Sequence, residues 1–102
     1  MDFDKLKEHY TFLIKEWLAN NKYEVSDHII DIIRIILLNK DGIMNSPGSG
    51  VQAFLSNNLF DFFRYADADV LANGKIIFLA FHNVETYYAA KTYKDSLLKA
   101  DL

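Results

Sequence analysis

An isoleucine-rich run, SDHIIDIIRIILLNKDG, constrains the fold of this chain more than any other part of its sequence. Isoleucine is common in β-strands, so a strand has to be considered first. However, the polar residues Asp27, Asp31 and Arg34 recur after four and three positions, which places them on one face of a helix but on both faces of a strand. The run therefore predicts a helix that begins after Ser26, a common N-cap residue, and ends before Gly42.

Almost the whole circumference of this helix is apolar. Eight residues surround its narrow polar stripe, namely Ile29, Ile30, Ile32, Ile33, Ile35, Ile36, Leu37 and Leu38. A helix of this kind is normally buried on all sides, which is difficult to achieve in a monomer of 102 residues. We therefore expect the helix to lie at the centre of the fold. We also expect a homo-oligomer, with Ile32 and Ile35 in its interface.

Three further segments have apolar residues at the three- and four-residue spacing of amphipathic helices. The first extends from an Asp2 cap to Asn20-Asn21, and its polar residues face solvent. The second starts near Val51 and continues through Phe63, with Phe60 off its main apolar face. The last extends from Val84 to about Lys99, with Asn83 as its cap.

Residues 67–82 are open to two interpretations. Asp67 or Asp69 can cap a helix that continues to His82 and contains Gly74, where a glycine costs about 1 kcal/mol relative to alanine. Alternatively, GKIIFLAFHN forms a buried strand. A lone strand has no evident partner in this sequence, so we favour the helix.

The predicted fold is accordingly all-α. We expect a single domain over residues 1–102, built as a compact bundle of four to five helices. The alternative is an α+β fold with a short strand at 75–82.

Composition argues against several classes of function. The net charge is −3, and only two of the eleven basic residues are arginines, which argues against nucleic-acid binding. The absence of cysteine excludes disulfides and thiolate metal sites and is typical of a reducing compartment. The N-terminus lacks the pattern of a secretory signal, and the longest apolar runs are shorter than the roughly 20 residues of a membrane span. We expect a cytoplasmic protein without membrane contact.

No catalytic or metal-binding motif is evident. The three histidines have no recognised ligand spacing, and Asp27, His28 and Asp31 are better explained as a capped helix start than as a metal site. Ser46 and Ser49 lie in a loop without the features of a serine nucleophile. We therefore expect no enzyme activity, no metal and no cofactor.

The segment SPGSG, directly before the helix at Val51, is the best candidate for a ligand site. Its glycines permit close backbone approach, and the helix start presents free N–H groups, so the loop could bind a phosphate or a carboxylate. It lacks the lysine and the spacing of a Walker A motif. The alternative is an ordinary connection between two helices. The candidate ligand-binding residues are Ser46, Gly48, Ser49, Gly50, Asn57 and Arg64.

Polar residues further along this helix need a separate explanation. Asn57 and Asn58 fall in the middle of the predicted helix, where asparagine is unfavourable because it competes for backbone groups. Arg64 and Asp67 are three residues apart, and we expect them to pair at the end of the helix.

The segment PGSGVQAFLSNNLFDFFRYAD resembles a segment of small helical proteins of unknown function from phages and prophages. The matching positions are Pro47, Gly48, Val51, Ala53, Leu55, Asn57, Asn58, Leu59, Ala66 and Asp67, followed by Phe81 and Asn83. The resemblance covers about 40 residues. It implies a phage or mobile-element origin and carries no known activity.

We expect a helical binding protein that acts through protein–protein contacts with a host or phage protein, for example to antagonise a host factor or defence system. Aromatic residues are enriched in interfaces, and the candidate interface residues are Ile32, Ile35, Phe60, Tyr65 and Tyr88. The alternative is a small-ligand binder, such as a nucleotide-sequestering protein that uses the loop at 46–51. An uncharacterised enzyme ranks third.

Overall fold

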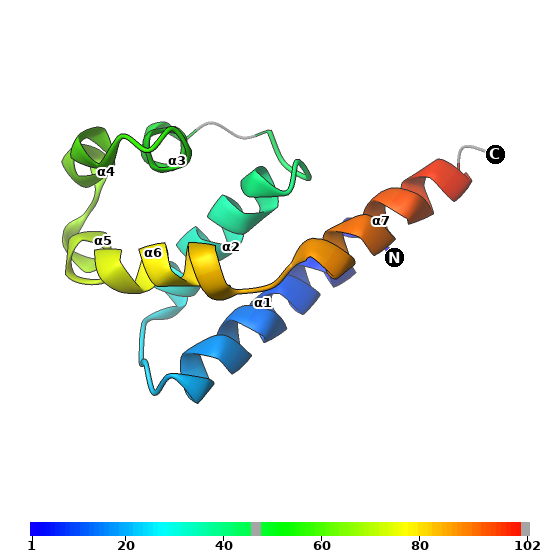
Figure 1. Ribbon diagram of the computed structural model, residues 1–102, viewed down its shortest axis with the longest axis horizontal. Helices are drawn as coiled ribbons and strands as arrows, with labels where there is room; N and C mark the ends of the chain where they lie inside the picture. The colour runs from blue at the N-terminus through cyan, green and yellow to red at the C-terminus, as the bar shows by residue number, and fades with distance from the viewer. Residues whose placement is uncertain (46–47, 101–102) are drawn as a thin grey trace.

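The computed structural model describes residues 1–45 and 48–100 (Figure 1). These residues form seven α-helices and no strand: α1 (Phe3–Asn20), α2 (Asp27–Lys40), α3 (Ser49–Leu55), α4 (Leu59–Tyr65), α5 (Ala68–Ala72), α6 (Gly74–Asn83) and α7 (Tyr87–Ala100). The predicted all-α class is confirmed, but the number of helices exceeds the predicted four to five. The alternative strand at 75–82 is wrong, because these residues lie inside α6.

The first two helices begin where the sequence predicts. The Asp2 side chain accepts a hydrogen bond from the backbone N–H of Lys5 at 2.8 Å. The Ser26 hydroxyl accepts one from Ile29 at 3.4 Å. Both caps satisfy N–H groups that have no partner inside the helix.

Helix α2 is the centre of the fold, as predicted. It contacts α1, α3 and α6, and six of its side chains are buried: Ile29, Ile30, Ile33, Ile36, Leu37 and Leu38. Ile32 and Ile35 are half-buried by the same chain. The helix is therefore covered mainly within one molecule, and its apolar surface no longer requires a second copy.

The predicted helix over 51–63 is in fact two short helices, α3 and α4. Asn57 has a φ of +59°, and Asn58 caps α4 by accepting a hydrogen bond from the N–H of Asp61 at 3.1 Å. The placement of both asparagines in mid-helix is wrong, because they form the turn. The chain reverses there, so that α4 packs against α3, with the rings of Phe54 and Phe62 centred 5.1 Å apart.

The segment 67–82 is likewise divided, into α5 and α6. The Asp67 carboxylate caps α5 by accepting from the N–H of Val70 at 2.9 Å, as the sequence suggests. The predicted position of Gly74 in the interior of a helix is wrong, because Gly74 is the first residue of α6. A Cβ at Gly74 would lie 2.9 Å from Cε1 of Phe63, so the absence of a side chain lets the Phe63 ring approach.

Helix α7 begins at Tyr87, three residues after the predicted start. Asn83 is the last residue of α6, where its side chain donates to the Leu79 carbonyl at 2.8 Å and does not cap α7. Val84 and Thr86 are buried in the connection. Helix α7 then packs along α1, and the rings of Phe3 and Tyr93 are 6.4 Å apart.

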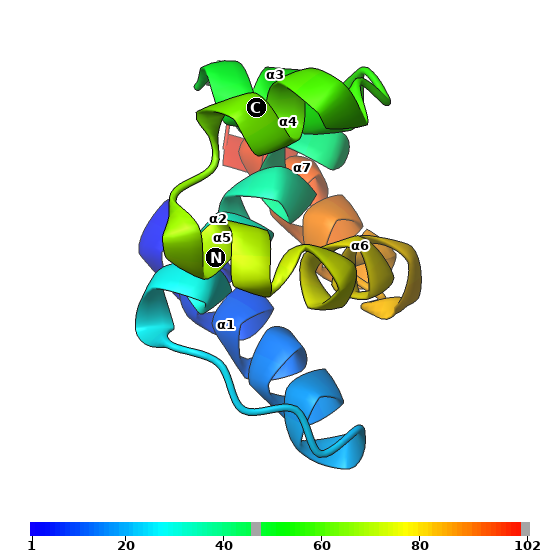
Figure 2. The ribbon, with the colours of Figure 1, turned by 90° about the vertical axis from the view of Figure 1, so that its left-hand side faces the viewer.

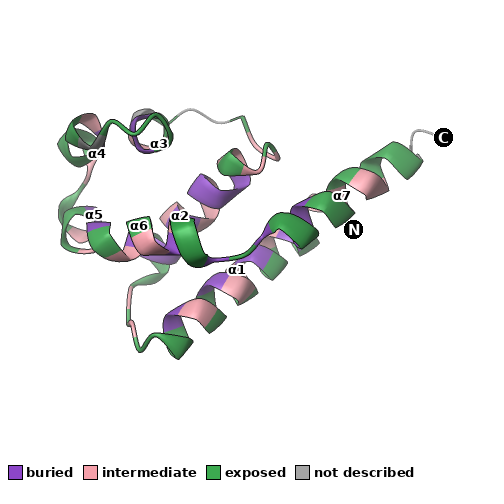
Figure 3. Cartoon of the chain, viewed as in Figure 1, coloured by how far each residue is buried: buried purple, intermediate pink, exposed green. Residues whose placement is uncertain are grey.

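The molecule is longer than a compact chain of this size. Helices α1 and α7 lie side by side, and α3 and α4 sit at the opposite end (Figure 1, Figure 2). The C-terminal end of α7 projects from the bundle and is mostly exposed (Figure 3). The radius of gyration is 14.0 Å, against about 13 Å for a compact domain of equal length. Among the described residues, none of the helices has the length and apolar character of a membrane span.

Candidate functional site

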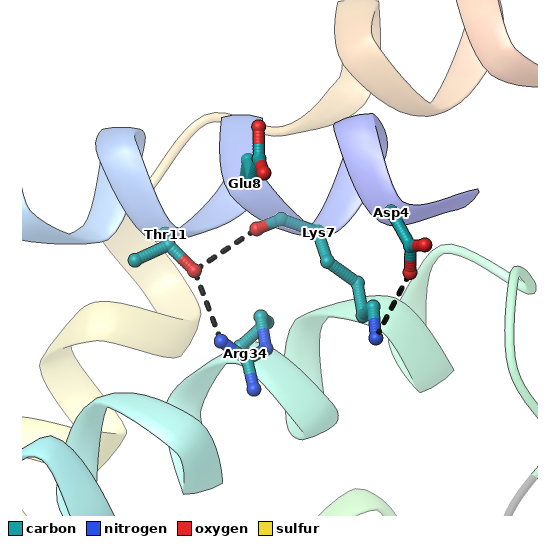
Figure 4. Close-up of a pocket in the computed structure, with 5 residues that line it drawn as sticks. All are labelled: Asp4, Lys7, Glu8, Thr11 and Arg34. Atoms are coloured by element: carbon teal, nitrogen blue, oxygen red, sulfur yellow. Dashed lines mark hydrogen bonds and ion pairs between the residues drawn. The ribbon is translucent and has the colours of Figure 1, made fainter. Parts of the chain in front are cut away.

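A polar groove of about 440 Å³ lies between α1 and α2 (Figure 4). The Arg34 guanidinium donates to the hydroxyl of Thr11 at 3.0 Å and pairs with Asp31 at 3.0 Å. The Thr11 hydroxyl donates in turn to the Lys7 carbonyl at 2.9 Å. The Arg34–Thr11 hydrogen bond joins the two helices across this groove, and the groove is best explained as part of the contact between α1 and α2.

A second polar cluster joins three distant segments around Asp41, the C-cap residue of α2. The hydroxyls of Tyr10 and Thr86 both donate to Asp41 Oδ2 at 2.6 Å, and the Lys94 ammonium donates to the Asp41 backbone carbonyl at 2.6 Å. Tyr10 and Thr86 are fully buried. The cluster fixes α7 to α1 and α2, and we call it the Asp41 clasp.

Burial of the Tyr10 ring raises the pKa of its hydroxyl, and the hydrogen bond to the Asp41 carboxylate raises it further. The physical cause is that a phenolate there would lose its hydration and face a second negative charge. Tyr10 therefore acts as a permanent donor at neutral pH. No buried side-chain nitrogen or oxygen lacks a partner in the described part of the chain, so the clasp is a structural element.

The N-termini of α2 and α5 are tied together by two side-chain contacts. His28 Nε2 lies 2.8 Å from Asp67 Oδ2, and the Ser26 hydroxyl donates to Asp69 at 2.6 Å. Hydrogen bonds from the Val70 N–H and from His28 lower the pKa of Asp67. The predicted Arg64–Asp67 pair is wrong, since no ion pair within the described residues joins them and Arg64 lies over the Tyr65 ring.

An apolar hollow of about 230 Å³ opens where α2, α3, α4 and α5 meet. Its apolar walls are Ile32, Val51, Phe62, Tyr65, Ala66 and Val70. Gly48, the N-cap of α3, Gly50 within α3, and Asp67 complete its lining. We call this site the apolar hollow.

A second depression of about 470 Å³ lies beside it, between α3 and α4. Its lining residues are Gln52, Ala53, Ser56, Asn58, Asp61 and Tyr65. Tyr65 is therefore shared by both sites. We call this second site the polar hollow.

The structure brings together only part of the predicted site. Gly48 and Gly50, predicted as ligand-binding residues, share the apolar hollow with Ile32 and Tyr65, predicted as interface residues. Asn57 and Arg64 are exposed and line neither hollow. Ser46, and the side chain of Ser49, lie outside what the structure describes.

The remaining predicted interface residues are scattered. Phe60 is 82% exposed on α4, the helix that also carries Phe62 and Tyr65. Tyr88 is 74% exposed on α7. Ile35 is half-buried on α2 and lines neither hollow. Tyr65 and Phe60 thus share a helix, while Tyr88 belongs to a different end of the molecule.

Five lining residues of the two hollows were not predicted as site residues from the sequence: Phe62, Ala66 and Val70 in the apolar hollow, and Gln52 and Asp61 in the polar hollow. The one available signal was aromatic density in LFDFFRY, which contains three phenylalanines and a tyrosine within seven residues. A single helix can bury only one face, so some of these rings had to be exposed or had to face another element.

A metal site is not supported by the described residues, where no group of three His, Asp or Glu side chains is placed to hold an ion. Comparison of the chain with protein-family models, with curated proteins and with solved structures found no match.

Proposed function

We propose that this chain is a helical binding protein that recognises another protein by taking an apolar side chain into the apolar hollow. The observation that carries this proposal is the hollow itself, an apolar depression of about 230 Å³ lined by Tyr65 and Phe62 and left open to solvent. Interface hot spots are commonly apolar or aromatic side chains seated in small, well-packed pockets.

The size of the hollow favours a side chain over a free metabolite. Pockets for small molecules usually measure about 300 to 1,000 Å³, and this one is smaller. The charge of its lining also opposes an anion, because the one charged residue among the described lining residues is Asp67, a carboxylate. The nucleotide alternative is therefore the weaker proposal.

Exposed aromatic side chains on α4, the helix that contributes Phe62 and Tyr65 to the hollow, supply further contact surface. Phe60 is 82% exposed, Tyr65 56% and Phe63 41%, all on the single helix α4. Such rings bury a large area while losing few rotameric states. A partner that covers α4 removes this apolar surface from water.

The segment that forms α3 and α4 is also the segment that resembles phage and prophage proteins. We accordingly propose a protein of the bacterial host as the partner, for example a defence factor, and the host cytoplasm as the place of action. The net charge of −3 supports a protein partner over a nucleic acid.

The test compares three immobilised forms of the protein in a bacterial lysate: the wild type, a Phe60→Ser/Tyr65→Ser variant, and a Phe12→Ser control. Phe12 is 59% exposed on α1, away from both hollows. We expect the wild type and the control to enrich the same protein, and the α4 variant to bind the purified partner about thirtyfold more weakly, as for loss of a hot spot.

Identical capture by all three forms would contradict the proposal. A thermal shift with nucleotides, abolished by the same α4 variant, would favour the small-ligand alternative. Circular dichroism checks that each variant keeps its helices.

A further inference from the structure

The two hollows adjoin along α3 and α4, and Tyr65 lines both. A partner segment that places one side chain in the apolar hollow and continues across Tyr65 therefore places a neighbouring side chain in the polar hollow. The chemistry of the second hollow then determines what that neighbour is.

Among the residues that the structure describes, the polar hollow is lined by neutral hydrogen-bonding side chains and one carboxylate, and by no cation. Its polar lining comes from Gln52, Ser56 and Asn58, together with the carboxylate of Asp61. Asp61 is half-buried, and its Oδ2 accepts a hydrogen bond from the Asn58 side chain at 2.8 Å. Within the described residues its Oδ1 has no hydrogen-bond or ion-pair partner. A free carboxylate oxygen in a depression is a good acceptor for an ammonium or a guanidinium.

The charged residues of the segment that forms the two hollows are also mostly acidic. From residue 45 to residue 73 the sequence contains three carboxylates, Asp61, Asp67 and Asp69, and a single basic residue, Arg64. Arg64 is directed to the Tyr65 ring, 5.7 Å from its centroid, and it lines neither hollow. Carboxylates thus lie on both sides of Tyr65, at Asp67 and at Asp61.

We propose that the site recognises a two-residue feature: an apolar or aromatic side chain for the apolar hollow, followed by a lysine or arginine for the polar hollow. This inference rests on the proposed function, and it adds the chemical class of the partner segment. The apolar residue supplies most of the affinity, and the cation selects among partners and fixes the direction of the segment, as charge complementarity does at interfaces.

The test uses two capped hexapeptides that are identical except at one position, with Phe-Lys or Phe-Glu at the centre and glycines on either side. Each is titrated into isotope-labelled protein, and backbone amide shifts are followed by NMR. We expect both peptides to perturb Val51, Phe62 and Ala66. The lysine peptide also perturbs Ser56 and Asp61, and it binds about fivefold more tightly, as expected for an exposed charge pair.

Two variants separate the hollows. Asp61→Asn keeps the shape of the side chain and removes its charge. We therefore expect this variant to bind the lysine and glutamate peptides about equally. Glu16→Gln, an exposed charge on α1, is the matched control and leaves the preference unchanged. Gly50→Leu adds a side chain to the lining of the apolar hollow, where a Cβ makes an ordinary 3.8 Å contact with Tyr65, and both peptides lose binding.

Equal binding of the two peptides, or a lysine preference that survives Asp61→Asn, overturns the two-residue inference while the apolar hollow stands. Absence of shifts at the apolar hollow with either peptide overturns the inference together with its basis. Tighter binding of the glutamate peptide reverses the assigned charge and also overturns it.

Discussion

At the scale of single residues, the Asp41 clasp is the contact with the greatest consequence. Its carboxylate accepts two hydroxyl groups from residues 31 and 45 positions away in the chain. Hydrogen bonds to a charged group contribute about 1.5 to 3 kcal/mol each, more than neutral ones. The sequence contains no sign of this, because Asp41 beside Gly42 is typical of an ordinary helix end.

The clasp predicts a dependence of stability on alkaline pH. An unfolded tyrosine ionises near pH 10, whereas burial and Asp41 raise the pKa of Tyr10 in the folded protein. Above about pH 10 the folded state therefore binds more protons than the unfolded state, and the free energy of unfolding falls as pH rises.

We expect this fall in wild-type protein and a weaker one in a Tyr10→Phe variant, measured by urea unfolding between pH 7 and pH 11. At pH 7 the variant is destabilised by about 1 to 3 kcal/mol, because the partly buried Asp41 carboxylate loses one donor. Tyr88→Phe, at an exposed ring, is the control. Equal pH dependence of Tyr10→Phe and wild type would contradict this account.

At the scale of elements, the breaks between helices decide the site. The turn at Asn57 reverses α4 against α3, and this reversal brings Tyr65 to a hollow that also contains Val51. Had the helix continued, residues 14 positions apart would lie about 21 Å apart along one axis. The contact between α3 and α4 therefore forms the site.

Asn57 occupies the left-handed region, which costs non-glycine residues about 1 to 2 kcal/mol and asparagine less than most. We expect Asn57→Ala to lower the free energy of unfolding by about 1 kcal/mol, and Asn57→Gly to leave it unchanged or raise it, in urea titrations. The two substitutions serve as each other's control, because both remove the amide. Equal effects of alanine and glycine would show that the backbone conformation is not the cause.

At the scale of the whole molecule, the chain has more surface than its mass requires. It exposes 6575 Å², whereas about 5,900 Å² is typical of a folded monomer of 11.8 kDa. Part of the excess lies on α7, where Leu97 and Leu98 are 49% and 67% exposed. The homo-oligomer expected from α2 stays a prediction, and the exposed leucines of α7 now favour a different interface from Ile32 and Ile35.

We expect light scattering coupled to size-exclusion chromatography to give a mass above that of one chain, and Leu97→Lys/Leu98→Lys to reduce it to one chain. The reason is that a second copy would cover apolar surface that the first leaves exposed, and two lysines would oppose this by desolvation and repulsion. Phe60→Ser is the control. A single-chain mass for the wild type at all concentrations would refute the oligomer.

Several features of this protein could be derived from the sequence by itself: the all-α class, the starts of α1 and α2, the central place of α2 and the cap at Asp67. All depend on interactions within one or two turns, since apolar periodicity and capping act between residues three or four positions apart. Such signals can be read along the chain. They show which face of a helix is buried, but they do not show what covers it.

Only the tertiary structure decided where the later helices break and which side chains meet. The end of α3 and the start of α6 depend on contacts such as Phe54 with Phe62 and Gly74 with Phe63. The apolar hollow combines Ile32 with Val70, 38 positions later. The sequence predicts that the glycines of SPGSG bind an anion, whereas in the structure Gly48 and Gly50 line a hollow whose other lining side chains are mostly apolar. The physical reason is that a site takes its polarity from residues distant in sequence, and these become neighbours only when the chain is folded.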